Sequence, residues 1–250
     1  MDRTSMGRYW TEDSANYGRV IASEFGSFRE DAWKGIFSLL LPQAPAPVLD
    51  FGCGPGFFTL LLSELGYDAL GIDISEGMVR EAARNREIRE SATSARFVHS
   101  DAGLSGFPDN TFSAIVTRNV TWTLPDPEGF YREAKRVHSP SGVLLVFDAN
   151  WNLPLFDEAL SRRCNARHAA CIEKFGCDYD GDPISEPLDL RSLPMSSRVR
   201  PEWDAAYLDS LGFEDVAASD DITDLVWDEK ERLLYGETPL FAIRAVKPRD

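Results

Sequence analysis

The sequence lacks any long hydrophobic run. No apolar stretch approaches the ~20 residues that a helix needs to cross a bilayer, and "GIFSLLLP" at 35–42 is much shorter. The first 20 residues hold no continuous apolar segment of the kind that forms a signal peptide. We therefore expect no membrane association and a cytoplasmic protein.

Basic residues and cysteines are also scarce. The 26 Lys and Arg residues are outnumbered by 41 Asp and Glu, which gives a net charge of −15. Proteins that bind nucleic acid normally carry a basic face, so this balance argues against a nucleic-acid partner. The four cysteines, without a secretory signal, indicate reduced thiols rather than a disulfide framework.

Apolar runs and helical patterns alternate along the first 150 residues. Residues 10–40 have helical spacing, and "PQAPAP" then leads into the strand "VLDF". The pattern predicts helices at 56–66, 75–92 and 125–139, the second with Ser75 as N-cap. It predicts further strands at 68–74, 95–102, 112–119 and 142–150. Such alternation is typical of a parallel sheet covered by helices on both faces.

The pattern changes after Asn150. A helix at 156–176 precedes an acidic, proline-containing stretch at 177–194, and two late strands are expected at 213–219 and 239–247. We predict a Rossmann-like α/β fold: a doubly wound, mostly parallel seven-stranded sheet with an antiparallel C-terminal strand. Four parts follow from this: N-terminal helices forming a lid (1–44), the core (45–151), an inserted cap (152–200) and the completion of the sheet (201–250). The cap is expected at the carboxyl ends of the strands, where open α/β sheets bind ligands.

The stretch "DFGCGPG" at 50–56 requires a tight turn, because three glycines stand at alternate positions. The dinucleotide fingerprint would read G-x-G-x-x-G with a pyrophosphate on the helix N-terminus. Here the spacing is G-x-G-x-G, and Asp50 would repel a pyrophosphate but suit a ligand with an ammonium group. Cys53 fits as a small filler of the turn without a catalytic thiol.

Acids also end the next two predicted strands. Asp73 can accept hydrogen bonds from ribose hydroxyls, a role shared by several nucleoside-binding α/β folds. Asp101 is placed to accept from an adenine amino group. Structural alternatives exist for each acid: Asp50 as a cap of the turn, Asp73 as a helix cap and Asp101 in an Asx-turn.

Taken together, "VLDFGCGPG", "GIDISEGMV", "SDA", "FSAIVTRNVTWTLPDP" and "RVHSPSGVLLVFDANW" resemble the motifs of class I S-adenosylmethionine-dependent methyltransferases. The resemblance covers residues ~45–151 well and implies S-adenosyl-L-methionine as cofactor and S-adenosyl-L-homocysteine as product. By position in these motifs, it implies cofactor contacts for Tyr17, Asp50, Gly52, Cys53, Gly54, Gly56, Asp73, Ile74, Met78, Asp101, Ala102, Arg118 and Asn119.

The resemblance implies a small-molecule acceptor with an N, O or C nucleophile. We place acceptor contacts after the fourth and fifth strands and in the cap, at Trp122, Asn150, Trp151, Arg198 and Arg200. No catalytic base is identified, and we expect a monomer or a homodimer. Two alternatives remain: a cofactor-binding protein with a regulatory or assembly role, and an NAD-dependent oxidoreductase, which the glycine spacing and Asp50 disfavour.

A cluster of soft ligands lies in the predicted cap. Cys164, His168 and Cys171 share one face of a helix and Cys177 follows, a spacing that a soft metal or an arsenical would fit. Because free cysteines are often buried and no CxxC pair is present, we favour packing and predict no metal site.

Overall fold

The computed structural model describes residues 2–92, 94–101, 103–176 and 188–249. In this part of the chain a seven-stranded sheet has the order β3-β2-β1-β4-β5-β7-β6. The strands span Pro47–Phe51 (β1), Asp68–Asp73 (β2), Arg96–His99 (β3), Phe112–Arg118 (β4), His138–Asp148 (β5), Glu214–Ser219 (β6) and Phe241–Val246 (β7). β1 to β5 are parallel, and β7 runs antiparallel to both β5 and β6. The predicted fold class is confirmed.

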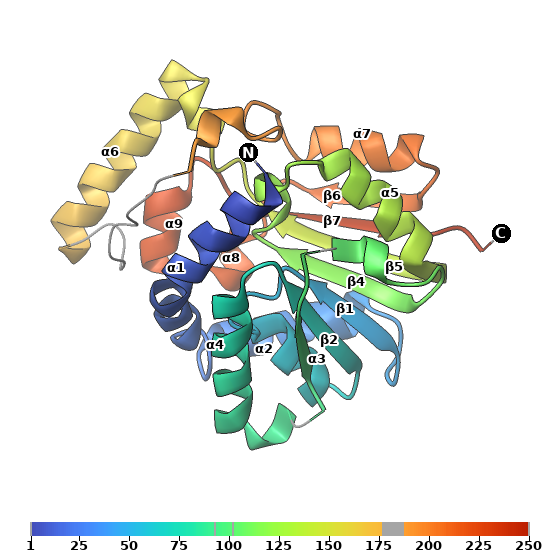
Figure 1. The fold of residues 1–250 in the computed structure, drawn as a ribbon. Coiled ribbons are helices and arrows are strands. Elements are labelled where there is room, and N and C mark those ends of the chain that lie inside the picture. Colours follow the sequence, from blue (N-terminus) through green and yellow to red (C-terminus); the bar gives the residue numbers. More distant parts are fainter. Residues whose placement is uncertain (1, 93, 102, 177–187, 250) are drawn as a thin grey trace.

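Helices cover both faces of this sheet (Figure 1). They span Arg3–Ala22 (α1), Phe28–Leu40 (α2), Phe57–Glu64 (α3), Glu76–Ile88 (α4), Pro127–Val137 (α5), Glu158–Phe175 (α6), Glu202–Ser210 (α7), Thr223–Val226 (α8) and Glu229–Tyr235 (α9). One apolar core joins α2, α3 and α8 to the sheet, and a second joins α5 and α7 to its other face. The strands between them are buried on both sides, which explains their continuous apolar runs.

The strand order fixes where a ligand can bind. β1 lies between β2 and β4, so the chain leaves β1 toward one edge of the sheet and later returns on the other side of it. Loops that leave neighbouring strands in opposite directions open a crevice at the carboxyl ends of those strands. The glycine turn, which follows β1, therefore lies at this crevice.

Local boundaries differ from the sequence-based expectation in three places. The helical region 10–40 is two helices, because Gly26 adopts a φ of 70° and Ser27 caps α2. "SPSG" lies inside β5 rather than before it, with Ser141 at a φ of 61° where the pairing with β4 is irregular. The four-residue helix α8 was not expected.

The described residues of the 152–200 segment pack at one end of the molecule. Its helix α6 lies against α9, away from α4 and the β2 side of the sheet (Figure 1). Across the described part of the chain, no helix has the length and apolarity to cross a membrane.

Candidate functional site

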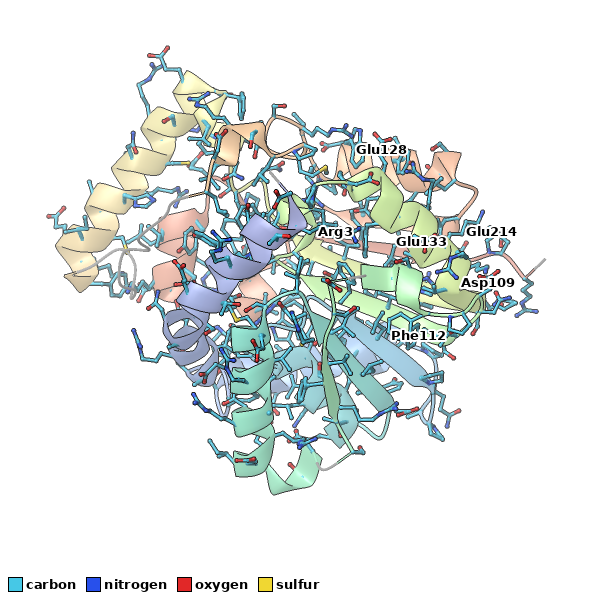
Figure 2. All side chains as sticks on the ribbon, in the orientation of Figure 1. Arg3, Asp109, Phe112, Glu128, Glu133 and Glu214 are labelled. Atoms are coloured by element: carbon cyan, nitrogen blue, oxygen red, sulfur yellow. The ribbon has the colours of Figure 1, made fainter. Side chains whose placement is uncertain are left out.

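A cavity of ≈ 230 Å³ lies at the carboxyl ends of β1, β2 and β4. Its walls come from α1, the glycine turn, the loops after β2, β3 and β4, and α5. Figure 2 labels two of the lining residues, Arg3 at the start of α1 and Glu133 on α5. The predicted residues in the lining are Tyr17, Gly52, Gly54, Asp73, Ile74, Met78, Asp101, Arg118 and Asn119.

The glycine turn forms one wall, and at Gly52 it leaves no room for a side chain. The backbone N–H groups of Gly52 and Cys53 donate to the carbonyl of Ile72 at 2.8 and 3.0 Å, which holds the turn against β2. Gly52 has a φ of 71°, and a Cβ there would lie 2.4 Å from the Val120 side chain. The glycine turn and the Val120 side chain in the loop after β4 are therefore too close together for any residue but glycine at position 52.

Gly56 has a different role from the one the resemblance implied. It does not line the cavity; it begins α3 with a φ of 89°. A Cβ at Gly56 would lie 2.8 Å from the Phe97 ring and 2.9 Å from Ala82, so this glycine permits close packing of α3 against β3 and α4.

Asp73 ties the glycine turn to α4. One carboxylate oxygen accepts from the Gly54 N–H at 2.9 Å and the other from the Ser75 N–H at 2.8 Å. Ser75 is the N-cap of α4, as predicted, and accepts from the Met78 N–H. Burial raises the pKa of Asp73 to about 6, although these backbone N–H groups oppose the shift. Each oxygen keeps a lone pair for a further donor in the cavity.

Asp50 points into the fold and caps α3. One of its oxygens accepts from the Thr59 N–H at 3.0 Å and the Thr59 hydroxyl at 2.6 Å. Asp50 lines a smaller cavity next to the main one, together with Tyr17, Arg118 and Cys53. Burial raises the pKa of Asp50 to about 7, and burial also raises the pKa of the Cys53 thiol, which keeps that thiol protonated. Asp50 thus makes the contacts of a helix cap, the structural alternative named for it above.

The residues that end β4 carry polar groups to both cavities. The Arg118 guanidinium pairs with Glu24 at 2.7 Å, lies over the Phe58 ring and lines both cavities. Asn119 has a φ of 57°, and its buried Oδ1 has no hydrogen-bond partner among the described residues. A buried acceptor without a partner is costly, so this atom points to a donor on a ligand.

Helix α1, in the region predicted to form an N-terminal lid, forms one wall of the cavity; of its lining residues the sequence analysis named only Tyr17. Met6 and Trp10 line the cavity together with Tyr17, and Arg3 donates to the Asp101 carbonyl at 3.2 Å. Helix α1 docks closely on α4 because Gly77 has no side chain. A Cβ at this position would lie only 2.5 Å from the Ser14 hydroxyl oxygen. The i, i+4, i+7 spacing of Met6, Trp10 and Asp13 marks a buried face that could have been identified from sequence.

The residues predicted for acceptor binding do not line the cavity. Arg200 is 3% exposed and paired with Asp148 and Asp204, and Asn150 bonds the backbone of Arg200. The remaining three pack on other aromatic rings: Arg198 on Trp203, Trp151 on Trp227 and Tyr235, and Trp122 on Trp10, a lining residue. No described residue of 152–200 lines the cavity, so the expectation that this segment covers it finds no support here.

Two of the predicted positions lie outside the described residues, namely Ala102 and Cys177. Of the predicted soft-ligand set, Cys171 is buried and Cys164 half-buried, and neither forms a disulfide bond with a described residue. No group of three or more metal-ligating side chains with suitable geometry occurs among the residues that the structure describes.

Comparison with known proteins identifies the domain. Residues 49–146 match the methyltransferase domain family, and these residues include the glycine turn and strands β2 to β4. The chain belongs to the class I S-adenosylmethionine-dependent methyltransferases.

Two curated relatives carry the same domain. A 2-methyl-6-phytyl-1,4-hydroquinone methyltransferase of Synechocystis sp. is 35% identical over 195 residues, covering 72% of this chain and 56% of that protein. A sterol 24-C-methyltransferase of Gibberella zeae is 33% identical over 102 residues, covering 40% of this chain and 27% of that protein. The chain thus spans at most about half of the length of these relatives.

A solved structure shares the fold. The phosphoethanolamine N-methyltransferase 2 of Haemonchus contortus, in complex with S-adenosyl-L-methionine, aligns with a TM-score of 0.58 at 14% identity, covering 87% of this chain and 52% of that chain. The cavity of the present methyltransferase domain offers hydrogen-bond acceptors that suit the hydroxyl and amino groups of this cofactor: strand-end carboxylates, and the Asn119 Oδ1, which no described residue satisfies.

The buried carboxylate of Asp50 yields a stability prediction. Because its folded pKa of about 7 lies above its ordinary 3.8, ionisation opposes folding, an effect complete above pH 7 and lost as the pH falls toward 4. An Asp50→Asn variant keeps an oxygen for Thr59, so at pH 8 we expect it to be more stable by about 1–3 kcal/mol, which is about 3–10 °C in Tm.

Thermal melts at pH 8 and pH 5 test this prediction, with Asp68→Asn as the control. Asp68 pairs with Arg96 at the exposed start of the next strand, where an ion pair contributes little. A gain at pH 8 that shrinks at pH 5, in Asp50→Asn alone, is the expected result. An equal loss at both pH values would contradict it.

The close docking of α1 yields a second prediction. Gly77→Val places two methyl groups where Ser14 lies and should separate α1 from α4, raising the rate of tryptic cleavage at Arg8 about tenfold or more. Gly35→Val is the matched control, because a Cβ on this exposed helical glycine meets nothing within 4 Å. Equal cleavage rates in the two variants would show that α1 does not depend on this contact.

Proposed function

We propose that this protein transfers a methyl group from S-adenosyl-L-methionine to a small-molecule acceptor and releases S-adenosyl-L-homocysteine. The observation that carries the proposal is the convergence of the glycine turn, Asp73, Asp101 and Asn119 on one cavity of a methyltransferase domain. Nothing in this arrangement resembles a pyrophosphate site, since Asp50 lies directly behind the glycine turn.

The bound cofactor supplies a methyl group on a positively charged sulfur, an electrophile that needs alignment more than activation. In the proposed arrangement Asp73 accepts from the ribose hydroxyls, and Ile74 and Met78 pack on the adenine, whose edge meets Asp101. The Gly52–Gly56 turn passes beside the sugar and the amino-acid portion. Arg118 and Tyr17, which line both cavities, lie near the amino-acid end.

The acceptor we propose is an apolar small molecule. Two observations favour it: the relatives named above act on a hydroquinone and a sterol, and Met6, Trp10, Val120 and Leu124 contribute apolar wall to the cavity. Helix α1 covers one side of the cavity, so a cofactor and an acceptor bound beneath it would be partly shielded from water, which favours a partly desolvated nucleophile. We further propose a cytoplasmic place in small-molecule metabolism, which fits the lack of a disulfide bond among the described cysteines.

A regulatory role without catalysis is the second candidate, because the cofactor-binding residues would be the same. Transfer of labelled methyl from S-adenosyl-L-methionine to a hydroquinone, a sterol and phosphoethanolamine separates the candidates and ranks the acceptor classes. Turnover of either apolar acceptor supports the proposal. Micromolar binding of S-adenosylhomocysteine without turnover of any acceptor favours the regulatory role, and binding of NAD⁺ in its place would refute both.

The pKa of Asp73 predicts a pH dependence of cofactor binding. Only the ionised carboxylate accepts two ribose hydroxyls, so the Kd for S-adenosylhomocysteine should rise about tenfold between pH 7 and pH 5, on either side of a pKa of about 6. Asp73→Asn should bind more weakly at pH 7 and lose this dependence, whereas Asp68→Asn on the same strand should keep it. Calorimetric titration measures all three, and parallel pH profiles for Asp73→Asn and wild type would argue against a ribose contact.

A further inference from the structure

A buried ionic network lies behind the cavity, at the carboxyl end of β5. The Arg200 guanidinium donates to Asp148 at 3.0 Å and to both oxygens of Asp204 at 2.7 and 2.8 Å. These three side chains are at most 1% exposed, and the Tyr131 hydroxyl also donates to Asp204. Burying such charges is expensive, and well-packed apolar side chains often replace them without loss of stability. The network therefore calls for an explanation beyond stability.

The network holds the loop that follows β4, residues 119–126. The oxygen of Asp148 that Arg200 contacts also accepts from the Trp122 N–H at 2.9 Å and from the Thr121 hydroxyl. Arg200 in addition donates to that hydroxyl oxygen at 2.6 Å. Asp148 thus binds both Thr121 and Trp122, and Arg200 binds Thr121 directly and Trp122 only through Asp148.

The same loop forms a wall of the cavity. The Trp122 indole N–H donates to the Asn119 carbonyl at 3.0 Å, which continues the chain of hydrogen bonds from Arg200 to a lining residue. Val120, between them, lies against Gly52 so closely that no Cβ fits there. Because this contact has no slack, a shift of the loop changes the width of the cavity.

We propose that Arg200 is a positioning residue: through Asp148 it fixes Thr121 and Trp122, and thereby sets where Asn119 and Val120 stand on the wall of the cofactor cavity. The proposal rests on the proposed function, since it takes this cavity to bind S-adenosylmethionine. It gives the 152–200 segment a role that its sequence position alone did not reveal. The segment acts on the cavity from behind, through Arg200 at its end, rather than by lining it.

The test compares Arg200→Met with Arg29→Met, measuring both Tm and the Kd for S-adenosylhomocysteine. Arg29 is the matched control: it is also nearly buried, bridges Asp228 and Glu231, and does not line the cavity. Both variants should lower Tm. We expect Arg200→Met to raise Kd about tenfold and Arg29→Met to change it less than about twofold. Arg200→Lys, which keeps one charge without the planar fork, should fall between wild type and Arg200→Met.

Trp122→Phe keeps the test decisive if Arg200→Met does not fold. It removes the donor to the Asn119 carbonyl while keeping a ring, and we expect Kd to rise about threefold with little change in Tm. Combined with Arg200→Lys, its effect on Kd should be less than additive, because both variants loosen the same loop.

Two results would overturn the proposal. Equal changes in Kd for Arg200→Met and Arg29→Met would leave Arg200 a purely structural residue, as would additive effects of Arg200→Lys and Trp122→Phe. Failure of the proposed function gives a different pattern, since the wild-type protein itself would then not bind S-adenosylhomocysteine, and the positioning role would fall with it.

Discussion

The carboxylate of Asp73 is the interaction on which the site depends. Its two oxygens accept from Gly54 and Ser75, so one side chain joins the turn after β1 to the helix after β2 across the crevice. Asp50 makes the corresponding connection inward, to the first turn of α3. Burial raises the pKa of both carboxyls, and the Asp73 carboxylate raises that of Asp50 further by repulsion. Hydroxyl and ammonium donors of the proposed ligand would offset the cost of keeping these buried carboxylates charged.

The cavity is built from two layers that follow different rules. Its floor comes from strand ends and the glycine turn, which the sheet topology brings together whatever the surface helices do. Its cover comes from α1, a helix at the start of the chain that docks on α4 where Gly77 leaves room for Ser14. Because these contacts leave little room for adjustment, we expect a larger side chain at Gly77 to separate α1 from α4. The width of the cavity is then set by the loop after β4, which presses on Gly52.

The fold and the floor of the site could be predicted from sequence because local patterns determine them. Alternating apolar runs, the cap at Ser75, and glycines that need positive φ are each readable without knowing distant contacts. Apart from Met78 on α4, the predicted cofactor contacts that line the cavity belong to strand ends, to loops next to them or to α1. The contribution of Met6 and Trp10 was missed because an amphipathic face shows that a helix is covered, and does not show by what.

The residues predicted for acceptor binding show where such reasoning stops, because none of them lines the cavity. Arg198 and Arg200 were chosen by their position in the predicted cap alone. Yet the run "GVLLVFDA" in β5 ends in an acid within an apolar strand, and a carboxylate buried there requires a cation. Arg200 meets that requirement, and Asp204, four residues later on the next helix, completes it. A strand-end acid thus has two possible partners, a ligand or an internal arginine. Asp73 remains accessible in the cavity wall because backbone N–H groups satisfy it only in part, whereas Asp148 is fully occupied by protein.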